Sequence, residues 1–98
     1  MIIMRRHRYL VAYDIRDPRR LRLVAKKMED FGDRTQYSVF LCDLTRADVA
    51  DMTRALLTVI DSTIDRILIV DLGSGDSDSR FEFLGRRHGL PTTGHRVL

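Results

Sequence analysis

The residues best suited to chemistry in this chain are one aspartate and the arginines around it. Asp14 ends the β-prone run of residues 8–14, and the end of a strand that precedes a crossover helix is a common functional position. Guanidinium groups bind phosphate oxygens in a bidentate manner. A metal held by Asp14 and a phosphate backbone held by the arginines is the chemistry that this pattern favours. The arginines are Arg16, Arg19, Arg20, Arg22 and Arg34.

Each of these residues also has a structural interpretation. Asp14 could stabilise the turn that leads into Asp17 and Pro18, and the arginines could form the solvated face of a helix. One carboxylate alone makes a poor magnesium site, because Mg²⁺ usually combines one or two carboxylates with water and phosphate oxygens. A two-fold dimer would bring two copies of Asp14 together and supply a pair.

The charge of the chain is small in total but unevenly distributed. The net charge is +3, yet residues 1–34 alone carry a local charge of +5 and residues 43–78 a local charge of −5. Fifteen of the 17 basic residues are arginine, which a GC-rich coding bias explains equally well. A segregated basic surface favours binding to nucleic acid.

Several further residues could support such a site. Tyr13 points to the face of the strand opposite to Asp14. Gln36 and Ser38 are polar residues in an otherwise apolar strand and need hydrogen-bond partners or ligand contact. Tyr37 and Phe40 could stack on bases, although packing in the core is favoured for both. Tyr13, Ser38 and Phe40 are predicted as supporting residues.

Other chemistries are disfavoured. The three histidines, His7, His88 and His95, lack the spacing of metal ligands. Cys42 has no neighbouring histidine and is expected to be a small buried residue. The sequence Gly73-Ser74-Gly75 lacks the Lys-Ser/Thr ending of a phosphate-binding loop. Zinc chemistry, thiol catalysis and hydrolysis of nucleoside triphosphates are therefore not expected.

The elements that must position Asp14 begin with a strand over residues 8–14 and a helix after it. Asp17 is the predicted N-cap of that helix and Pro18 its first residue, while Gly32 occupies the predicted position just after the helix. The uncharged segment 35–42 predicts a buried strand, or two short strands broken by a bulge near Ser38.

The second half repeats the order of helix and strand. Thr45 with Asp48 resembles a capping box, and the helix it begins is expected to extend to about residue 60. Residues 66–72 form the strongest predicted strand, followed by an acidic loop over 73–79. Residues 81–84 and 95–98 are short β-prone segments.

This order predicts an α+β fold, a ferredoxin-like two-layer sandwich of the form βαββαβ with a short C-terminal strand. Residues 1–98 form a single domain with a core over about 8–84, and segment 85–98 is expected to dock a partner or a second copy. Because two helices cover only one face of a four-stranded sheet, a homodimer is expected to cover the other face.

The composition of the chain limits the cellular compartments in which it is expected. A single cysteine indicates a reducing compartment, and no apolar run approaches the length of a membrane helix. The first residues have no pattern of a secretory signal, and whether translation begins at Met1 or Met4 is open. A cytoplasmic protein without membrane contact is expected.

Three blocks of residues resemble a known family. They are Tyr13-Asp14-Ile15, Arg20-Leu21-Arg22, and the stretch Phe31-Gly32-Asp33-Arg34-Thr35-Gln36-Tyr37-Ser38-Val39-Phe40. In order and spacing they resemble the CRISPR-associated protein two family over roughly residues 8–73. The block from Gln36 to Phe40 is the most specific part of the resemblance, and the last 25 residues match only in outline.

The resemblance implies a ferredoxin-like homodimer in which Asp14 is the metal ligand and catalytic residue, with Mg²⁺ or another divalent cation such as Mn²⁺. It implies a metal-dependent endonuclease acting on RNA, or on double-stranded DNA, in spacer acquisition for antiviral defence with the CRISPR integrase subunit as partner. The basic residues of the family correspond to Arg20, Arg22 and Arg34. The leader, residues 1–7, is longer than is typical of the family.

Two hypotheses for function follow. The first is a Mg²⁺-dependent phosphodiesterase centred on paired Asp14 carboxylates. The second is a non-catalytic dimeric scaffold that binds duplex DNA through its arginines and docks the integrase through its C-terminal segment. A small regulatory ferredoxin-like domain is a third and less favoured alternative.

Overall fold

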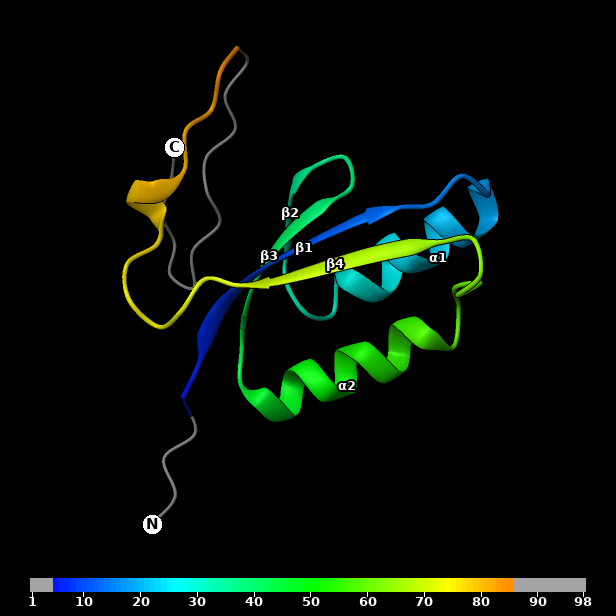
Figure 1. The fold of residues 1–98 in the computed structure, drawn as a ribbon, viewed down its shortest axis with the longest axis horizontal. Coiled ribbons are helices and arrows are strands. Elements are labelled where there is room, and N and C mark those ends of the chain that lie inside the picture. Colours follow the sequence, from blue (N-terminus) through cyan, green and yellow to red (C-terminus); the bar gives the residue numbers. More distant parts are fainter. Residues whose placement is uncertain (1–4, 86–98) are drawn as a thin grey trace.

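A computed structural model of the chain describes residues 5–85, in which strands and helices follow the predicted order βαββαβ (Figure 1). The elements in chain order are β1 (His7–Asp14), α1 (Pro18–Met28), β2 (Asp33–Gln36), β3 (Val39–Leu44), α2 (Arg46–Leu57), β4 (Arg66–Asp71) and a short 3₁₀ helix, η1 (Asp78–Arg80).

The four strands form one sheet in the order β2-β3-β1-β4, and every neighbouring pair is antiparallel. Both helices lie on the same side of this sheet, and β1 runs through its middle between β3 and β4 (Figure 1). This arrangement confirms the predicted ferredoxin-like α+β sandwich. No helix in the described part of the chain is long and apolar enough to span a membrane.

Side chains of β1 alternate between the two faces of the sheet. Tyr9, Val11 and Tyr13 are buried in the core with the helices, so Leu10, Ala12 and Asp14 point to the face that the helices leave open. The helices contribute their buried apolar residues to the same core: Val24, Met28, Met52 and Leu56.

Both helices begin at the predicted caps. The Asp17 carboxylate accepts the Arg20 amide at 2.9 Å, with Pro18 as the first helical residue. Thr45 and Asp48 form a reciprocal capping box: the Asp48 amide donates to Thr45 Oγ1 at 3.1 Å, and the Thr45 amide donates to Asp48 Oδ2 at 3.0 Å. Each side chain satisfies an amide that the helix leaves without a partner.

Gly32 does not have the role predicted from its position. It follows the last residue of α1 by four positions, and its φ is not positive, so it is not a left-handed helix cap. A Cβ on Gly32 would lie 2.4 Å from both Cys42 Sγ and the Leu41 carbonyl oxygen. Gly32 is required because β3 passes so close to it.

Of the two alternatives for segment 35–42, the structure has the two short strands, β2 and β3. They are separated by a turn at Tyr37 and Ser38 and not by a bulge near Ser38, and a register irregularity lies between Arg34 and Gln36. One strand prediction is wrong. Residues 81–84 are not a strand; instead the rings of Phe81 and Phe83 stack at 6.3 Å. The predicted C-terminal strand at 95–98 lies outside the described residues.

Candidate functional site

Asp14 is held in place by its chain neighbours while its own carboxylate stays exposed. Tyr13 and Ile15 are both only 6% exposed and belong to the core, whereas Asp14 is exposed at the end of β1. Within residues 5–85, the Asp14 carboxylate makes no hydrogen bond or ion pair. An anchored, exposed and unpaired carboxylate is available to bind a cation.

The nearest basic side chain by strand pairing is one that the sequence analysis did not single out. Arg66, the first residue of β4, pairs with Asp14 in the antiparallel register, and cross-strand partners lie on the same face of a sheet. Both residues line a shallow pocket with Asp65, Tyr13 and Leu68. Only the pairing of β4 with β1, which sequence spacing does not reveal, identifies Arg66.

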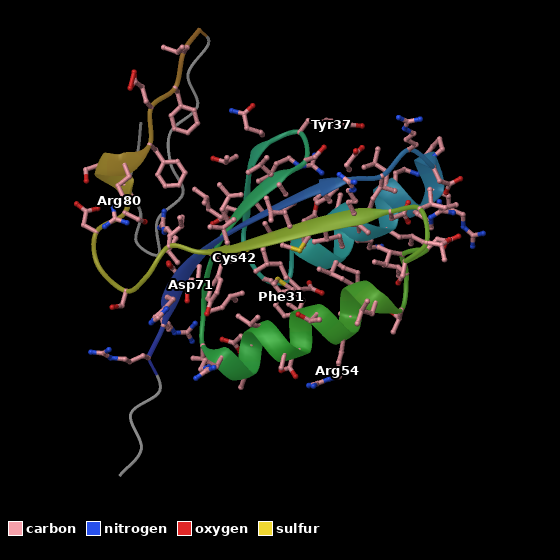
Figure 2. The ribbon with its side chains drawn as sticks, in the orientation of Figure 1. Phe31, Tyr37, Cys42, Arg54, Asp71 and Arg80 are labelled. Atoms are coloured by element: carbon pink, nitrogen blue, oxygen red, sulfur yellow. The ribbon has the colours of Figure 1, made fainter. Side chains whose placement is uncertain are left out.

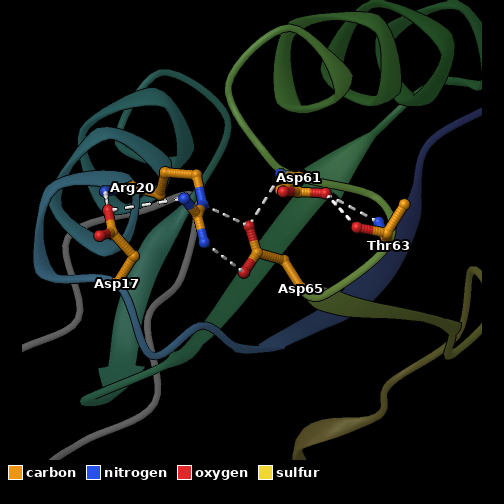
Figure 3. A network of polar contacts seen from close by, with 5 residues as sticks. All are labelled: Asp17, Arg20, Asp61, Thr63 and Asp65. Atoms are coloured by element: carbon orange, nitrogen blue, oxygen red, sulfur yellow. Dashed lines mark hydrogen bonds and ion pairs between the residues drawn. The ribbon is translucent and has the colours of Figure 1, made fainter.

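Arg20 is engaged within the fold, as Figure 3 shows. Its Nε donates to Asp65 Oδ2 at 2.8 Å and its Nη2 donates to Asp65 Oδ1 at 3.3 Å. Its Nη1 also lies 3.8 Å from Asp17 Oδ2. The Asp65 side chain is fully buried, and the Asp61 amide donates a further hydrogen bond to Asp65 at 2.8 Å.

The network shifts the pKa values of its members. The Arg20 hydrogen bond, followed by the Asp61 amide, lowers the pKa of Asp65. The hydroxyl and amide of Thr63 donate to the Asp61 carboxylate and lower the pKa of that group. The Asp65 hydrogen bond raises the pKa of Arg20. Within this network, each of the two carboxylates, Asp61 and Asp65, therefore accepts hydrogen bonds that stabilise its charged form.

These contacts give Arg20 a structural role. Arg20 is bound to Asp65 and ties α1 to the loop before β4, while its predicted contact with nucleic acid stays a prediction. Arg19 and Arg22 are exposed on α1, which lies in the helix layer and not on the open face to which Asp14 points. Arg16 is exposed in the loop that joins Asp14 to α1.

Arg34 lies beside two aromatic rings. Its guanidinium carbon is 5.4 Å from the ring centroid of Phe40 and 5.8 Å from that of Tyr37. Phe40 is 1% exposed and packs in the core as expected, but Tyr37 is 72% exposed, so the expectation of core packing is wrong for Tyr37. Figure 2 shows Tyr37 at the tip of the β2–β3 hairpin.

The other supporting residues contribute to structure near Asp14. The Tyr13 ring faces the core and stacks on Phe40 at 6.2 Å, and its buried hydroxyl has no hydrogen-bond partner in the described residues. Ser38 accepts the Tyr13 amide through its backbone carbonyl at 3.1 Å. The turn of the hairpin is thereby joined to the end of β1. Gln36 is exposed and has no need of a buried partner.

One protomer has few groups near Asp14 that could bind a metal. Residues 5–85 contain no group of three or more His, Cys, Asp or Glu side chains arranged to hold a metal. The neighbouring carboxylate, Asp65, is already bound to Arg20. At this end of the sheet a single protomer therefore offers one unpaired carboxylate, that of Asp14.

Comparison with known proteins gives a consistent result. The family model described as CRISPR associated protein Cas2 matches residues 7–80. The chain is 43% identical over 81 residues to a CRISPR-associated endoribonuclease Cas2 of Rhodospirillum rubrum, covering 82% of this chain and 79% of the relative. It is 41% identical over 71 residues to that of Geobacter sulfurreducens, covering 72% of this chain and 75% of the relative.

Solved structures agree with the sequence comparison. The crystal structure of Streptococcus pyogenes Cas2 matches with a TM-score of 0.74 and 40% identity, covering 80% of this chain and 99% of that one. A hypothetical protein from Thermus thermophilus matches with a TM-score of 0.73 and 32% identity, covering 83% and 93%. From its sequence and its fold alike, the chain belongs to the CRISPR associated protein Cas2 family.

Proposed function

We propose that this chain is a CRISPR-associated endoribonuclease that hydrolyses phosphodiester bonds with Asp14 as its catalytic and metal-binding residue. The observation that carries the proposal is the exposed, unpaired Asp14 carboxylate at the end of the central strand β1. Its relatives are named CRISPR-associated endoribonucleases, and a metal-dependent nuclease holds its cation with carboxylates of this kind.

Two Asp14 carboxylates, one from each copy of the chain, would fit a hard divalent cation, Mg²⁺ or Mn²⁺, which prefers carboxylate oxygens. When bound, such a cation lowers the pKa of a water molecule and neutralises charge that develops on the phosphate. Asp14 would hold it. Arg16, two residues after Asp14 in the chain, and Arg66, its partner across the sheet, would bind the phosphate oxygens and orient the scissile bond.

The second carboxylate would come from a second copy of the chain. Leu68 is 59% exposed on the face of the sheet that the helices leave open, and Leu10 and Val70 are only partly buried there. Burial of apolar surface on a sheet face against a partner stabilises the complex that they form. Asp14 points to the same face, so a two-fold dimer formed through it would bring the two sites toward each other.

We further propose that the dimer acts in the cytoplasm during spacer acquisition, with the CRISPR integrase subunit as its protein partner and RNA or DNA as its substrate. Arg19, Arg22 and Arg34 are exposed and would extend the contact with the backbone away from Asp14. Segment 85–98 is proposed to dock the partner, and all of it but Gly85 lies outside the described residues.

A metal-titrated cleavage assay tests the nuclease. Cleavage of single-stranded RNA should appear as Mg²⁺ or Mn²⁺ is added and disappear with EDTA. Asp14→Asn should lower the rate by about 10²-fold or more, because loss of a metal ligand removes the metal's contribution. Asp30→Asn, which changes an exposed aspartate beyond α1, is the control and should cleave normally. Full activity of Asp14→Asn would refute the assignment.

The second candidate function is a non-catalytic DNA-binding scaffold of the integration complex. It is favoured by the single unpaired carboxylate that one protomer offers at this site. In this case Asp14→Asn should leave spacer acquisition intact, while Arg16→Glu should reduce it. Binding of duplex DNA should weaken steeply with salt, because each phosphate contact releases counterions. An affinity that does not change with salt would contradict the scaffold.

A further inference from the structure

The tip of the β2–β3 hairpin carries an exposed aromatic ring that the fold does not use. Tyr37 is 72% exposed, whereas the other two tyrosines, Tyr9 and Tyr13, are 8% and 6% exposed. A large ring in solvent exposes apolar surface without a gain in stability. The interactions that hold the turn come from the backbone of Ser38, not from the ring of Tyr37.

The ring is nevertheless oriented. The Arg34 guanidinium lies over it at 5.8 Å and lies over the buried Phe40 ring at 5.4 Å, both within the range of a cation–π contact. Phe40, Arg34 and Tyr37 thus make a series that runs from the core to the surface. Its outer member is a flat ring with most of its area open to a further flat partner.

The turn that carries the ring lies at the same end of the sheet as the proposed catalytic carboxylate. The Ser38 carbonyl accepts the Tyr13 amide at 3.1 Å, which places the turn beside the end of β1. Arg34 pairs with the core residue Phe40 and so lies on the helix side of the sheet, whereas Asp14 points to the open face. Arg34 keeps an exposed cation next to the ring, and a cation there would attract the phosphate attached to any stacked base.

We infer that Tyr37 stacks on an unpaired nucleobase of single-stranded RNA whose phosphate contacts Arg34, and so selects single-stranded over duplex substrate. The inference rests on the proposed nuclease function and adds the residue that favours a single-stranded over a duplex substrate. In a duplex each base is covered by its neighbours in the stack and cannot offer a free face to Tyr37. A single strand can splay a base onto an aromatic side chain.

The test compares binding of a short single-stranded RNA with binding of the same RNA annealed to its complement, in the full chain. Tyr37→Ser should weaken binding of the single strand by about 5- to 100-fold, the usual effect of losing one stacked base. It should change duplex binding by less than about twofold. Tyr37→Phe keeps the ring and should bind the single strand as the native chain does. Gln36→Ala, an exposed neighbour in β2, is the matched control.

Tyrosine fluorescence gives a direct readout of the stacked ring. The chain has no tryptophan and three tyrosines, of which only Tyr37 is exposed. Single-stranded RNA should quench tyrosine emission in the native chain, and the Tyr37→Phe variant should bind equally well without that quenching. A base stacked on Tyr37 is the source of this difference.

The outcomes separate the inference from the proposed function. If Tyr37→Ser binds and cleaves single-stranded RNA like the native chain, or weakens single strand and duplex equally, the inference is refuted while the nuclease stands. If the native chain neither binds nor cleaves RNA with metal present, the nuclease proposal fails and the inference fails with it. An unchanged melting temperature of Tyr37→Ser confirms that a loss of binding is not a loss of folding.

Discussion

The guanidinium of Arg20 binds the buried carboxylate of Asp65, the residue immediately before β4 (Figure 3). The next residue, Arg66, pairs with Asp14 across the sheet. One ion pair therefore connects the first turn of α1 to the loop after α2. That loop leads directly into β4, whose first residue pairs with Asp14 at the candidate site. An arginine for which the family resemblance implies contact with nucleic acid thus also holds the framework of the site.

The Arg20–Asp65 pair should be important for stability. Asp65→Asn removes the charge that compensates Arg20 and places an amide donor against a guanidinium donor. The melting temperature should fall by about 5 °C or more, because a buried polar group loses its partner. Asp51→Asn is the control: Asp51 pairs with Arg54 on the surface of α2, and its loss should shift the melting temperature by less than about 2 °C. Equal shifts in the two variants would contradict the importance of the buried pair.

Stability should decline in acid. The folded chain lowers the pKa of Asp65 mainly through Arg20, of Asp48 through Thr45, and of Asp71 through the Gly73 amide and then His7. A carboxyl group whose pKa is lower in the folded than in the unfolded state stabilises the fold above its unfolded pKa. That contribution is lost as the pH falls through the folded pKa. The melting temperature should therefore decrease as the pH is lowered below about 4. The decrease should be shallower in Asp65→Asn. An identical acid profile for that variant would contradict the contribution of Asp65.

Gly32 should tolerate no side chain. The Cβ of Gly32→Ala would lie 2.4 Å from Cys42 Sγ and 2.4 Å from the Leu41 carbonyl oxygen, so β3 would have to move. We expect a loss of about 1–3 kcal/mol in the free energy of unfolding, measured by denaturant titration. Adding Cys42→Ala should restore only part of it, since the carbonyl clash persists. Gly75→Ala, where no atom lies within 4 Å, should be neutral, and a loss there as large as that of Gly32→Ala would contradict the steric explanation.

The open face of the sheet should mediate dimerisation. Leu68→Asp places a charge at a side chain that is 59% exposed in the single chain, so the protomer should still fold while the dimer dissociates. Light scattering coupled to gel filtration measures the mass. Leu57→Asp changes a leucine that is 57% exposed on α2, on the helix side, and should remain dimeric. A Leu68→Asp variant with the mass of the native chain would refute this interface.

The thiol of Cys42 should be inert in the folded chain. Cys42 is 2% exposed, and burial raises its pKa to about 12, so the reactive thiolate is scarce at neutral pH. A thiol reagent at pH 8 should label the chain only after unfolding in guanidinium. Rapid labelling of the folded chain, at the rate found in denaturant, would contradict the burial.

The elements and their caps could be predicted from sequence because their causes are local. Asp17 with Pro18, and Thr45 with Asp48, act over three residues and are found as predicted. The alternation along β1 correctly put Tyr13 and Asp14 on opposite faces of the sheet, because a strand reverses its side chains at every residue.

The remaining features depend on residues that are distant in sequence. Arg20 and Asp65 are 45 positions apart, and Arg66 becomes relevant to Asp14 only through the pairing of β4 with β1. Tyr37 was expected in the core because its segment is uncharged, but the hairpin turn falls on it and exposes it. Gly32 matches a helix-cap pattern, yet its actual constraint comes from β3.

The central position of β1 has a consequence for how the protein can vary. Asp14 ends a strand that is hydrogen-bonded on both sides, by β3 and by β4, so the amide protons of β1 should be among the slowest to exchange. Tyr37 lies on a two-residue turn that carries none of the core. A substitution at the hairpin tip should therefore alter contacts made by Tyr37 without moving Asp14, because the strand that holds Asp14 is paired along both of its edges.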